Sequence, residues 1–259
     1  MVSGIVSCKK VDGMLVLGID TTGPTGGVAL VEETQVLASF YLRRPPTFSL
    51  HLLRIIDVVC GQAGCQLADL TGVAISLGPG AFTGLRVGYA TAQGLAMAHG
   101  KPLLGCSTFE GLAALAIGWE GDVCPVIEAR RGEVYAALYH RHKTTVQEVL
   151  PGMVLTPEAL CTYIGERTLF LGSGVRAYGA VFADILGERA VCVESDVDVE
   201  AGLAISVARL GYKRLRIPSV NGLPTPQLLY IRAADARLPT RAVVGVGVSD
   251  GVTPERPKG

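Results

Sequence analysis

Short apolar runs separated by glycine-rich turns dominate the first sixty residues of the chain. Apolar residues fill 16–19 and 27–31, and the intervening Thr-Thr-Gly-Pro-Thr-Gly is typical of a β-hairpin turn. A third strand is predicted over 36–41. Residues 49–59 then change to helical spacing, with apolar side chains at Leu52, Leu53, Ile56 and Val59. The pattern therefore predicts three strands followed by an amphipathic helix.

A fully apolar strand and a second helix complete this first set of elements. The strand is predicted over 73–77, and the helix over 84–98 with Thr83 as its N-terminal cap. A similar order recurs later, with strands over 123–129, 134–139 and 146–150, a helix over 157–164 and a strand over 168–171. A repeated βββαβα unit is the ribonuclease-H-like pattern. Two such units in tandem predict an α/β protein of the actin/Hsp70-like class.

The same pattern suggests how the chain is divided into domains. We expect an N-terminal extension outside the fold over 1–13 and a flexible tail over 238–259, because neither end shows the periodicity of the ordered part. The first lobe is predicted over 14–105 and a second, degenerate lobe over 106–237. A further amphipathic helix over 199–210 is expected to pack back onto the first lobe.

Composition and charge narrow the classes of protein. Apolar residues make up 49% of the 259 residues and charged residues 18%, which excludes a disordered chain. The apolar runs all end before the roughly 18 residues that a membrane span needs, so no membrane association is expected. Lys plus Arg equals Asp plus Glu, and this zero net charge argues against strong RNA binding by the chain alone. The seven cysteines form no Cys-x-x-Cys pair, which favours reduced thiols in the cytoplasm and no metal site.

The densest motif is Ser-Leu-Gly-Pro-Gly-Ala-Phe-Thr-Gly-Leu-Arg-Val-Gly over 76–88. It lacks the Gly-Lys-Ser/Thr of a phosphate-binding loop and the spacing of a dinucleotide fingerprint. Its distinctive feature is a row of small residues four apart, which would let another element approach the helix closely. Packing against the chain's own core and packing against a partner subunit both remain open. The hypothesis for a partner interface comprises Leu52, Leu53, Ile56, Gly84, Leu85, Gly88, Ala92 and Ala96.

The motif over 76–88 resembles the hallmark of the TsaB (YeaZ) family. Residues 15–21 resemble the family's opening strand, Ile-Leu-x-Ile-Asp-Thr. Residues 128–135 resemble its Asp-Ala-Arg-x-Gly-Glu-Val-Tyr segment, and residues 226–232 its closing Pro-x-Tyr-x-Arg. The resemblance spans about residues 14–232, nearly all of the part expected to be ordered.

This resemblance implies an actin-like two-lobed fold and a function in tRNA modification. The chain would be a non-catalytic scaffold subunit in the synthesis of N6-threonylcarbamoyladenosine at tRNA position 37. Its partner would be a TsaD-like subunit, which carries the metal and the transferase chemistry, and a TsaE-like ATPase would join them. ATP would be used by the complex, tRNA would be contacted only through the complex, and the chain would form a homodimer when the partner is absent.

The chain departs from the family pattern on the helix over 49–59 and on the helix that follows the motif. Phe48 and Leu50 stand where the family tends to have His and Glu, and Gln93 stands where Lys is common. These changes make the first of the two helices more apolar on its contact surface than is usual in the family.

No catalytic constellation is visible in the sequence. None of the four histidines, His51, His99, His140 and His142, forms the His-x-x-x-His pair of the metal-bearing relative. No Gly-x-Ser-x-Gly nucleophile motif is present. We therefore expect no catalytic residue, no bound metal and no cofactor.

The strand-end residues Asp20 and Thr21 and the later glycines Gly172 and Gly174 are the candidates for a vestigial nucleotide pocket. They resemble the positions at which actin-like ATPases hold the metal, phosphates and nucleoside. Two ordinary turns are the interpretation that we favour over actual nucleotide binding, because Asp and Gly are preferred in turns for backbone reasons.

Two other functions remain as alternatives to the scaffold subunit. An autonomous glycoprotease-like hydrolase is suggested by kinship of fold alone, which is a weak argument for chemistry. A small actin-like kinase is suggested by Asp20 and the glycine-rich turns. The missing metal ligands argue against the first, and a titration with Mg-ATP would test the second.

Overall fold

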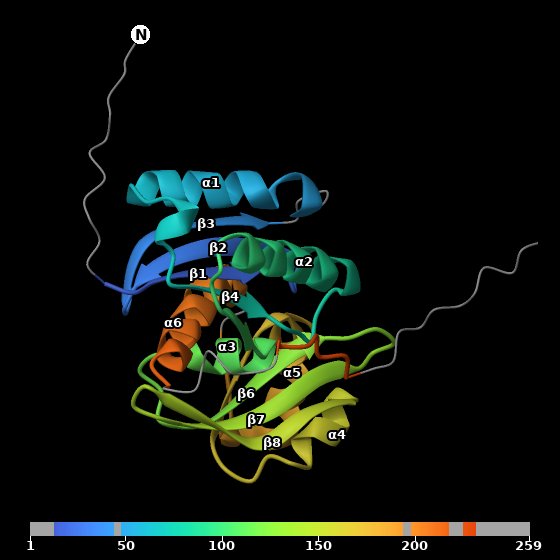
Figure 1. Cartoon of the computed structure of the whole chain (residues 1–259). Coiled ribbons are helices and arrows are strands. Elements are labelled where there is room, and N and C mark those ends of the chain that lie inside the picture. Colours follow the sequence, from blue (N-terminus) through green and yellow to red (C-terminus); the bar gives the residue numbers. More distant parts are fainter. Residues whose placement is uncertain (1–12, 44–47, 194–197, 218–224, 232–259) are drawn as a thin grey trace, which may run out of the picture.

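A computed structural model of the chain describes residues 13–43, 48–193, 198–217 and 225–231. Figure 1 shows two lobes, each built on a five-stranded sheet with helices packed around it. The N-terminal extension predicted over 1–13, apart from Gly13, and the tail predicted over 238–259 lie outside the described residues.

The first sheet combines the N-terminal antiparallel strands with two later parallel strands. They are β1 (Leu15–Asp20), β2 (Thr25–Glu32), β3 (Gln35–Arg43), β4 (Gly72–Ser76) and β5 (Leu103–Cys106). Their order is β3-β2-β1-β4-β5, with β1 antiparallel to β2 and parallel to β4. Every residue of β1 and β4 is buried, which explains their unbroken apolar runs, since helices cover both faces of the sheet.

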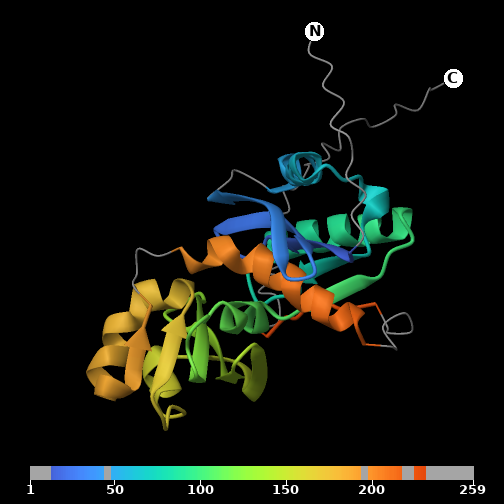
Figure 2. The same ribbon diagram turned by 90° about the vertical axis from the view of Figure 1, so that its left-hand side faces the viewer.

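The helices on the two faces of this sheet come from different parts of the chain (Figure 1, Figure 2). α1 (Leu52–Ala63), which follows the short turn η1 (Phe48–Leu50), packs with α2 (Phe82–Ala98) on one face. α6 (Leu203–Leu215) packs on the other face. α2 begins at Phe82, so Thr83 lies within its first turn and the prediction of Thr83 as the cap is wrong.

The second sheet repeats the topology of the first. Its strands are β6 (Gly121–Glu128), β7 (Val134–His142), β8 (Thr145–Leu155), β9 (Thr168–Leu171) and β10 (Ala190–Cys192). The order β8-β7-β6-β9-β10 matches β3-β2-β1-β4-β5 strand for strand. The helices are α3 (Thr108–Ala114), α4 (Pro157–Cys161) and α5 (Ser173–Leu186), with short turns η2 (Leu67–Asp69), η3 (Gly187–Arg189) and η4 (Val199–Gly202). The duplicated βββαβα fold predicted from the sequence is confirmed.

Small residues allow α6 to lie directly against β1 and β4. A Cβ placed on Gly18 would overlap the backbone of α6 at Ala204 and Ala208, and one on Gly211 would lie 2.6 Å from the Cβ of Ala74. The buried cluster around α6 also includes residues of α3 and of the second sheet. α6 therefore joins the two lobes through one core. The helix begins at Leu203, after η4, rather than at residue 199 as predicted.

The segment 225–231 crosses from the first lobe towards the second. The Leu229 N–H donates a 2.8 Å hydrogen bond to the carbonyl of Leu77, just after β4. The Tyr89 hydroxyl on α2 donates a 2.6 Å bond to the carbonyl of Pro226. At the other end, Ile231 packs so close to Gly152 of β8 that a Cβ on this glycine would lie 2.8 Å from its Cδ1. This segment therefore ties both lobes together beside the cleft between them.

Candidate functional site

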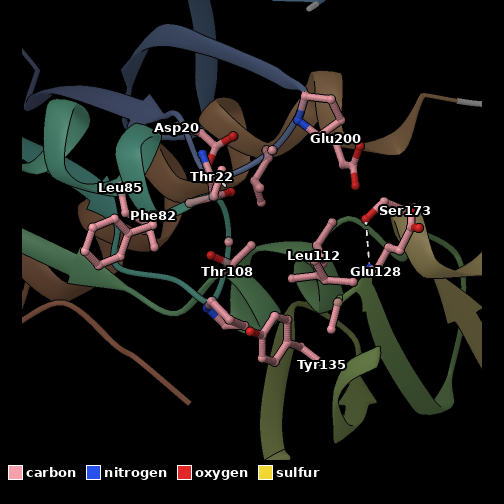
Figure 3. Close-up of a pocket in the computed structure, with 18 of the residues that line it drawn as sticks. Asp20, Thr22, Phe82, Leu85, Thr108, Leu112, Glu128, Tyr135, Ser173 and Glu200 are labelled. Atoms are coloured by element: carbon pink, nitrogen blue, oxygen red, sulfur yellow. Dashed lines mark hydrogen bonds between the residues drawn. The ribbon is translucent and has the colours of Figure 1, made fainter. Parts of the chain in front are cut away.

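A cavity of about 770 Å³ lies between the two lobes (Figure 3). The first lobe contributes Asp20 and Thr22 from the end of β1 and the turn after it, and the second lobe contributes Glu128 and Ser173. Glu200, on the η4 turn that leads into α6, lines a further side. The volume falls within the roughly 300–1,000 Å³ of small-molecule sites, so this cleft is the candidate site.

Asp20 is a buried carboxylate with only part of its hydrogen-bonding capacity used. Its side chain is 1% exposed, and its Oδ1 accepts a 2.8 Å bond from the Thr22 hydroxyl. Its Oδ2 has no hydrogen-bond partner. Burial raises the pKa of Asp20 to about 6, and the negative charge of Glu200 adds to the rise. The Ser76 hydroxyl offsets part of this rise in pKa, although it makes no hydrogen bond of ordinary geometry.

Glu200 reaches across the cleft to the first residue of α5. The hydroxyl and the backbone N–H of Ser173 lower the pKa of its carboxylate, although neither forms a hydrogen bond of ordinary geometry with it. Burial raises the pKa of Glu200, the Asp198 carboxylate raises it further, and the polar groups of Ser173 partly counteract both. Asp198 is itself fixed to the first lobe by a 3.0 Å bond from the Thr25 hydroxyl. The turn that carries both acids therefore links the two lobes.

Of the four residues predicted to form a nucleotide pocket, Asp20 is the one that lines the cavity. Asp20 lines the cavity, but the hydroxyl of Thr21 points away and donates a 2.7 Å bond to the carbonyl of Gly84. Gly172 and Gly174 pack against Val126, where a Cβ on either would lie 2.5 Å from a Val126 atom. These glycines serve the close approach of β9, α5 and β6. Ser173, which lies between the two glycines, lines the cavity together with Asp20, and a nucleotide pocket at these positions stays a prediction.

The row of small residues on α2 faces the chain's own core. A Cβ on Gly84 would overlap the carbonyl of Thr21, and a Cβ on Gly88 would overlap its hydroxyl. Ala92 and Ala96 are buried in the same layer. The prediction of a partner interface at these positions is therefore wrong, since the sheet of the same chain covers them. The prediction also fails, for the same reason, at three further buried residues, Leu52, Ile56 and Leu85.

The histidines and acids of the described residues form no metal centre. No group of three or more His, Cys, Asp or Glu side chains within residues 13–43, 48–193, 198–217 and 225–231 could hold a metal ion. His140 pairs instead with Asp122 at 2.8 Å, and His142 with Glu120 at 3.3 Å, on exposed strand ends. In the same part of the chain, none of the helices combines the length and the apolar character that a membrane span requires.

Comparison with known proteins identifies the family. A family model described as TsaD, tRNA N6-adenosine threonylcarbamoyltransferase, matches residues 46–193, which is more than half of the chain. The tRNA threonylcarbamoyladenosine biosynthesis protein TsaB of Bacillus subtilis is 28% identical over 179 residues, covering 68% of this chain and 78% of that protein. Its namesake from Escherichia coli is 36% identical over 135 residues, covering 51% and 58%. The chain belongs to this family, in its TsaB (YeaZ) branch.

A solved structure agrees with this TsaB assignment. The crystal structure of an uncharacterized protein with similarity to peptidase YEAZ from Pseudomonas aeruginosa superposes with a TM-score of 0.69 at 26% identity. The match covers 85% of this chain and 100% of that chain. The resemblance inferred from the motif over 76–88 is therefore confirmed.

Sequence reasoning missed several residues of this TsaB-family cleft. Glu200 gave no signal, because η4 brings it to the cleft from a distant part of the sequence, and Ser173 was not named although it lies between the predicted Gly172 and Gly174. Thr108, at the start of α3, also lines the cavity, and its hydroxyl has no hydrogen-bond partner. The closing motif over 226–232 was noticed only as a family resemblance, yet Leu229, Tyr230 and Ile231 line the cavity.

Proposed function

We propose that this chain is the non-catalytic subunit that pairs with a TsaD-like catalytic subunit in the synthesis of N6-threonylcarbamoyladenosine at tRNA position 37. Its TsaB-named relatives support a place in this biosynthetic system, and the TsaD family model supports kinship with the catalytic subunit. Membership of the pathway is common to these relatives. The division of labour within the complex is our inference.

The exposed face of the α1–α2 layer is the observation that carries the pairing. Leu50 in the η1 turn is 71% exposed, and Leu53 on α1 is 59% exposed. On α2, Met97 is 76% exposed. The same face of α2 carries a second row of small residues, Ala90, Gly94 and Ala98, all exposed. A row of this kind lets a partner helix approach closely, and the flanking apolar side chains supply area to bury.

This surface favours a helix bundle shared between two chains. The buried face of α2 holds the helix on its own sheet, and the opposite face is left for the partner. A TsaD-like subunit with a related fold would bring an equivalent helix pair, and a second copy of this chain would take its place when the partner is missing. A TsaE-like ATPase would join the complex and use ATP, tRNA would be contacted only through the complex, and all of this would occur in the cytoplasm.

Reconstitution tests this function directly. The purified chain alone should show no transferase, protease or ATPase turnover, and should restore tRNA modification only when mixed with the TsaD-like subunit and the ATPase. Deleting its gene should remove threonylcarbamoyladenosine from cellular tRNA, and complex formation should be visible by size-exclusion chromatography. Transferase turnover by the chain alone, or normal tRNA modification without it, would contradict the proposal.

A further inference from the structure

The cleft between the lobes is more negative than a phosphate site would be. Asp20, Glu128 and Glu200 line it, whereas Arg130 is the one basic side chain among the described residues that line it. Phosphate groups entering the cleft would meet carboxylates at short range, and like charges inside a partly desolvated cavity repel strongly. The charge of the lining therefore favours cationic ligands over nucleotides.

The natural anion site in the cleft lies near a carboxylate of the chain itself. α5 is a helix of 14 residues that begins at Ser173 beside the cavity, and its first free N–H would attract an anion. The carboxylate of Glu200 lies near this position, where the hydroxyl and the backbone N–H of Ser173 lower its pKa. A phosphate at this helix end would meet the negative side chain of Glu200.

Two residues that line the cavity each have a buried polar atom that forms no hydrogen bond of ordinary geometry and can accept one. The atoms are Oδ2 of Asp20, in a residue 1% exposed, and Oγ1 of Thr108, in a residue 2% exposed. Both residues line the cavity. The Ser76 hydroxyl acts on the Asp20 carboxylate without a hydrogen bond of ordinary geometry, so both Asp20 and Thr108 can still accept a bond from a ligand, as buried polar groups normally do from the protein, from water or from a ligand. An ammonium has three donors and a guanidinium has five, and neither has an acceptor.

We propose that the cleft binds an organic cation, the ammonium or guanidinium end of a small amine or of a basic side chain. Asp20 accepts its hydrogen bonds, and Glu200 and Glu128 supply negative potential. Aromatic and aliphatic side chains in the same lining, including Tyr135 and Leu112, can cover the hydrocarbon stem and face the charge. A divalent metal fits less well, because no cluster of three or more metal-ligating side chains exists in the part of the chain that the structure describes.

Calorimetric titration of the full chain with agmatine tests this proposal. Agmatine carries a guanidinium and an ammonium on a four-carbon stem, and Mg-ATP is the anionic comparison. Agmatine should bind the native chain and the control variant Glu188→Gln, whose carboxylate is exposed and lies outside the cavity lining. Asp20→Asn and Glu200→Gln should each weaken binding about ten-fold, since each removes one negative charge and keeps the side chain's shape.

Thermal melting of each variant controls for folding, and a second variant guards against a failure of Asp20→Asn to fold. Glu128 is exposed at the rim, so Glu128→Gln should leave the fold intact and weaken agmatine binding about three-fold. Equal binding of agmatine to the native chain and to folded Asp20→Asn and Glu128→Gln would overturn the proposal. So would tighter binding of Mg-ATP than of agmatine.

The complex with the TsaD-like subunit distinguishes the two sources of the cation. If a basic side chain of the partner occupies the cleft, forming the complex should displace agmatine. If the ligand is a free amine, the complex should still bind agmatine with the same dependence on Asp20. Both results support the shared chemistry. The inference does not rest on the proposed role in tRNA modification, because agmatine binding is measured first on the chain alone.

Discussion

The hydroxyl of Thr21 donates a 2.7 Å hydrogen bond to the backbone carbonyl of Gly84. This bond joins the end of β1 to the first turn of α2, and it requires the helix to lie almost in contact with the strand. Side chains at Gly84 and Gly88 would overlap Thr21. The glycines of the densest motif therefore serve the packing of α2 on its own sheet.

Gly88→Ala should destabilise the fold, because its new methyl group would overlap the Thr21 hydroxyl. Overpacking of this kind costs about 1–3 kcal/mol of the free energy of unfolding. Gly94→Ala on the same helix is the matched control, because a methyl group at this exposed position would meet no atom within 4 Å. It should raise stability by roughly 0.5–1 kcal/mol. Urea unfolding of both variants measures the contrast, and similar stability changes would argue against close packing at Gly88.

Apolar periodicity predicted most of the strands and helices of the fold. β1 and β4 are buried over their whole length, and such runs are hard to misread. The short β5, α3 and β10 were not predicted, because three to seven residues provide too little periodicity.

The residues of the candidate site come together from distant parts of the sequence, so local patterns could not identify the site. The four-residue spacing from Gly84 to Ala96 correctly indicated close packing, but spacing cannot say which neighbour is close. A second row with the same spacing lies on the opposite face, at Ala90, Gly94 and Ala98, and spacing by itself does not show which of the two faces contacts a partner. Glu200 is distant in sequence from both Asp20 and Ser173, so its place in the cleft follows only from the path of η4 and α6.

Asp20→Asn should change how stability depends on pH. Burial raises the pKa of Asp20 from 3.8 to about 6, so the folded chain holds this proton more tightly than the unfolded chain does. Stability should therefore fall as the pH rises from about 4 to 6, by roughly 3 kcal/mol for a shift of this size. The raised pKa of Glu200, which faces Asp20, also makes stability fall as the pH rises. The informative quantity is therefore the difference in stability between the native chain and the variant at each pH.

Melting temperatures from pH 4 to pH 8 measure that difference. The variant should be more stable than the native chain at pH 8, and the gap should shrink as the pH falls below 6. Asp184→Asn, at an exposed position on α5, controls for the loss of a carboxylate elsewhere. Parallel pH profiles for the native chain and Asp20→Asn would show that burial does not raise the pKa of Asp20.

Tyr89→Phe should loosen the segment that ties the lobes together. The Tyr89 hydroxyl donates a 2.6 Å bond to the carbonyl of Pro226, and its loss should lower the free energy of unfolding by about 1 kcal/mol. Tyr163→Phe, at an exposed position after α4, is the control and should have little effect. Hydrogen exchange at the Leu229 amide, which donates to Leu77, should become faster in Tyr89→Phe alone. Unchanged exchange there would mean that other contacts hold the segment.

The outward face of α1 gives the most direct test of the partner surface. Leu53 is exposed, whereas Ile56 on the same helix is 1% exposed. Leu53→Glu should therefore keep the melting temperature of the isolated chain and abolish binding to the TsaD-like subunit, because a charge would be buried in the shared bundle without a partner. Ile56→Glu should instead unfold the chain or lower its stability severely. Ile185→Glu, at an exposed position on α5 in the second lobe, should affect neither stability nor binding.

The two readouts are the melting temperature and the threonylcarbamoyladenosine content of tRNA from cells that carry each variant. A Leu53→Glu chain that still binds its partner and restores modification would exclude the α1–α2 face. Loss of modification by Ile185→Glu would place the partner on the second lobe instead.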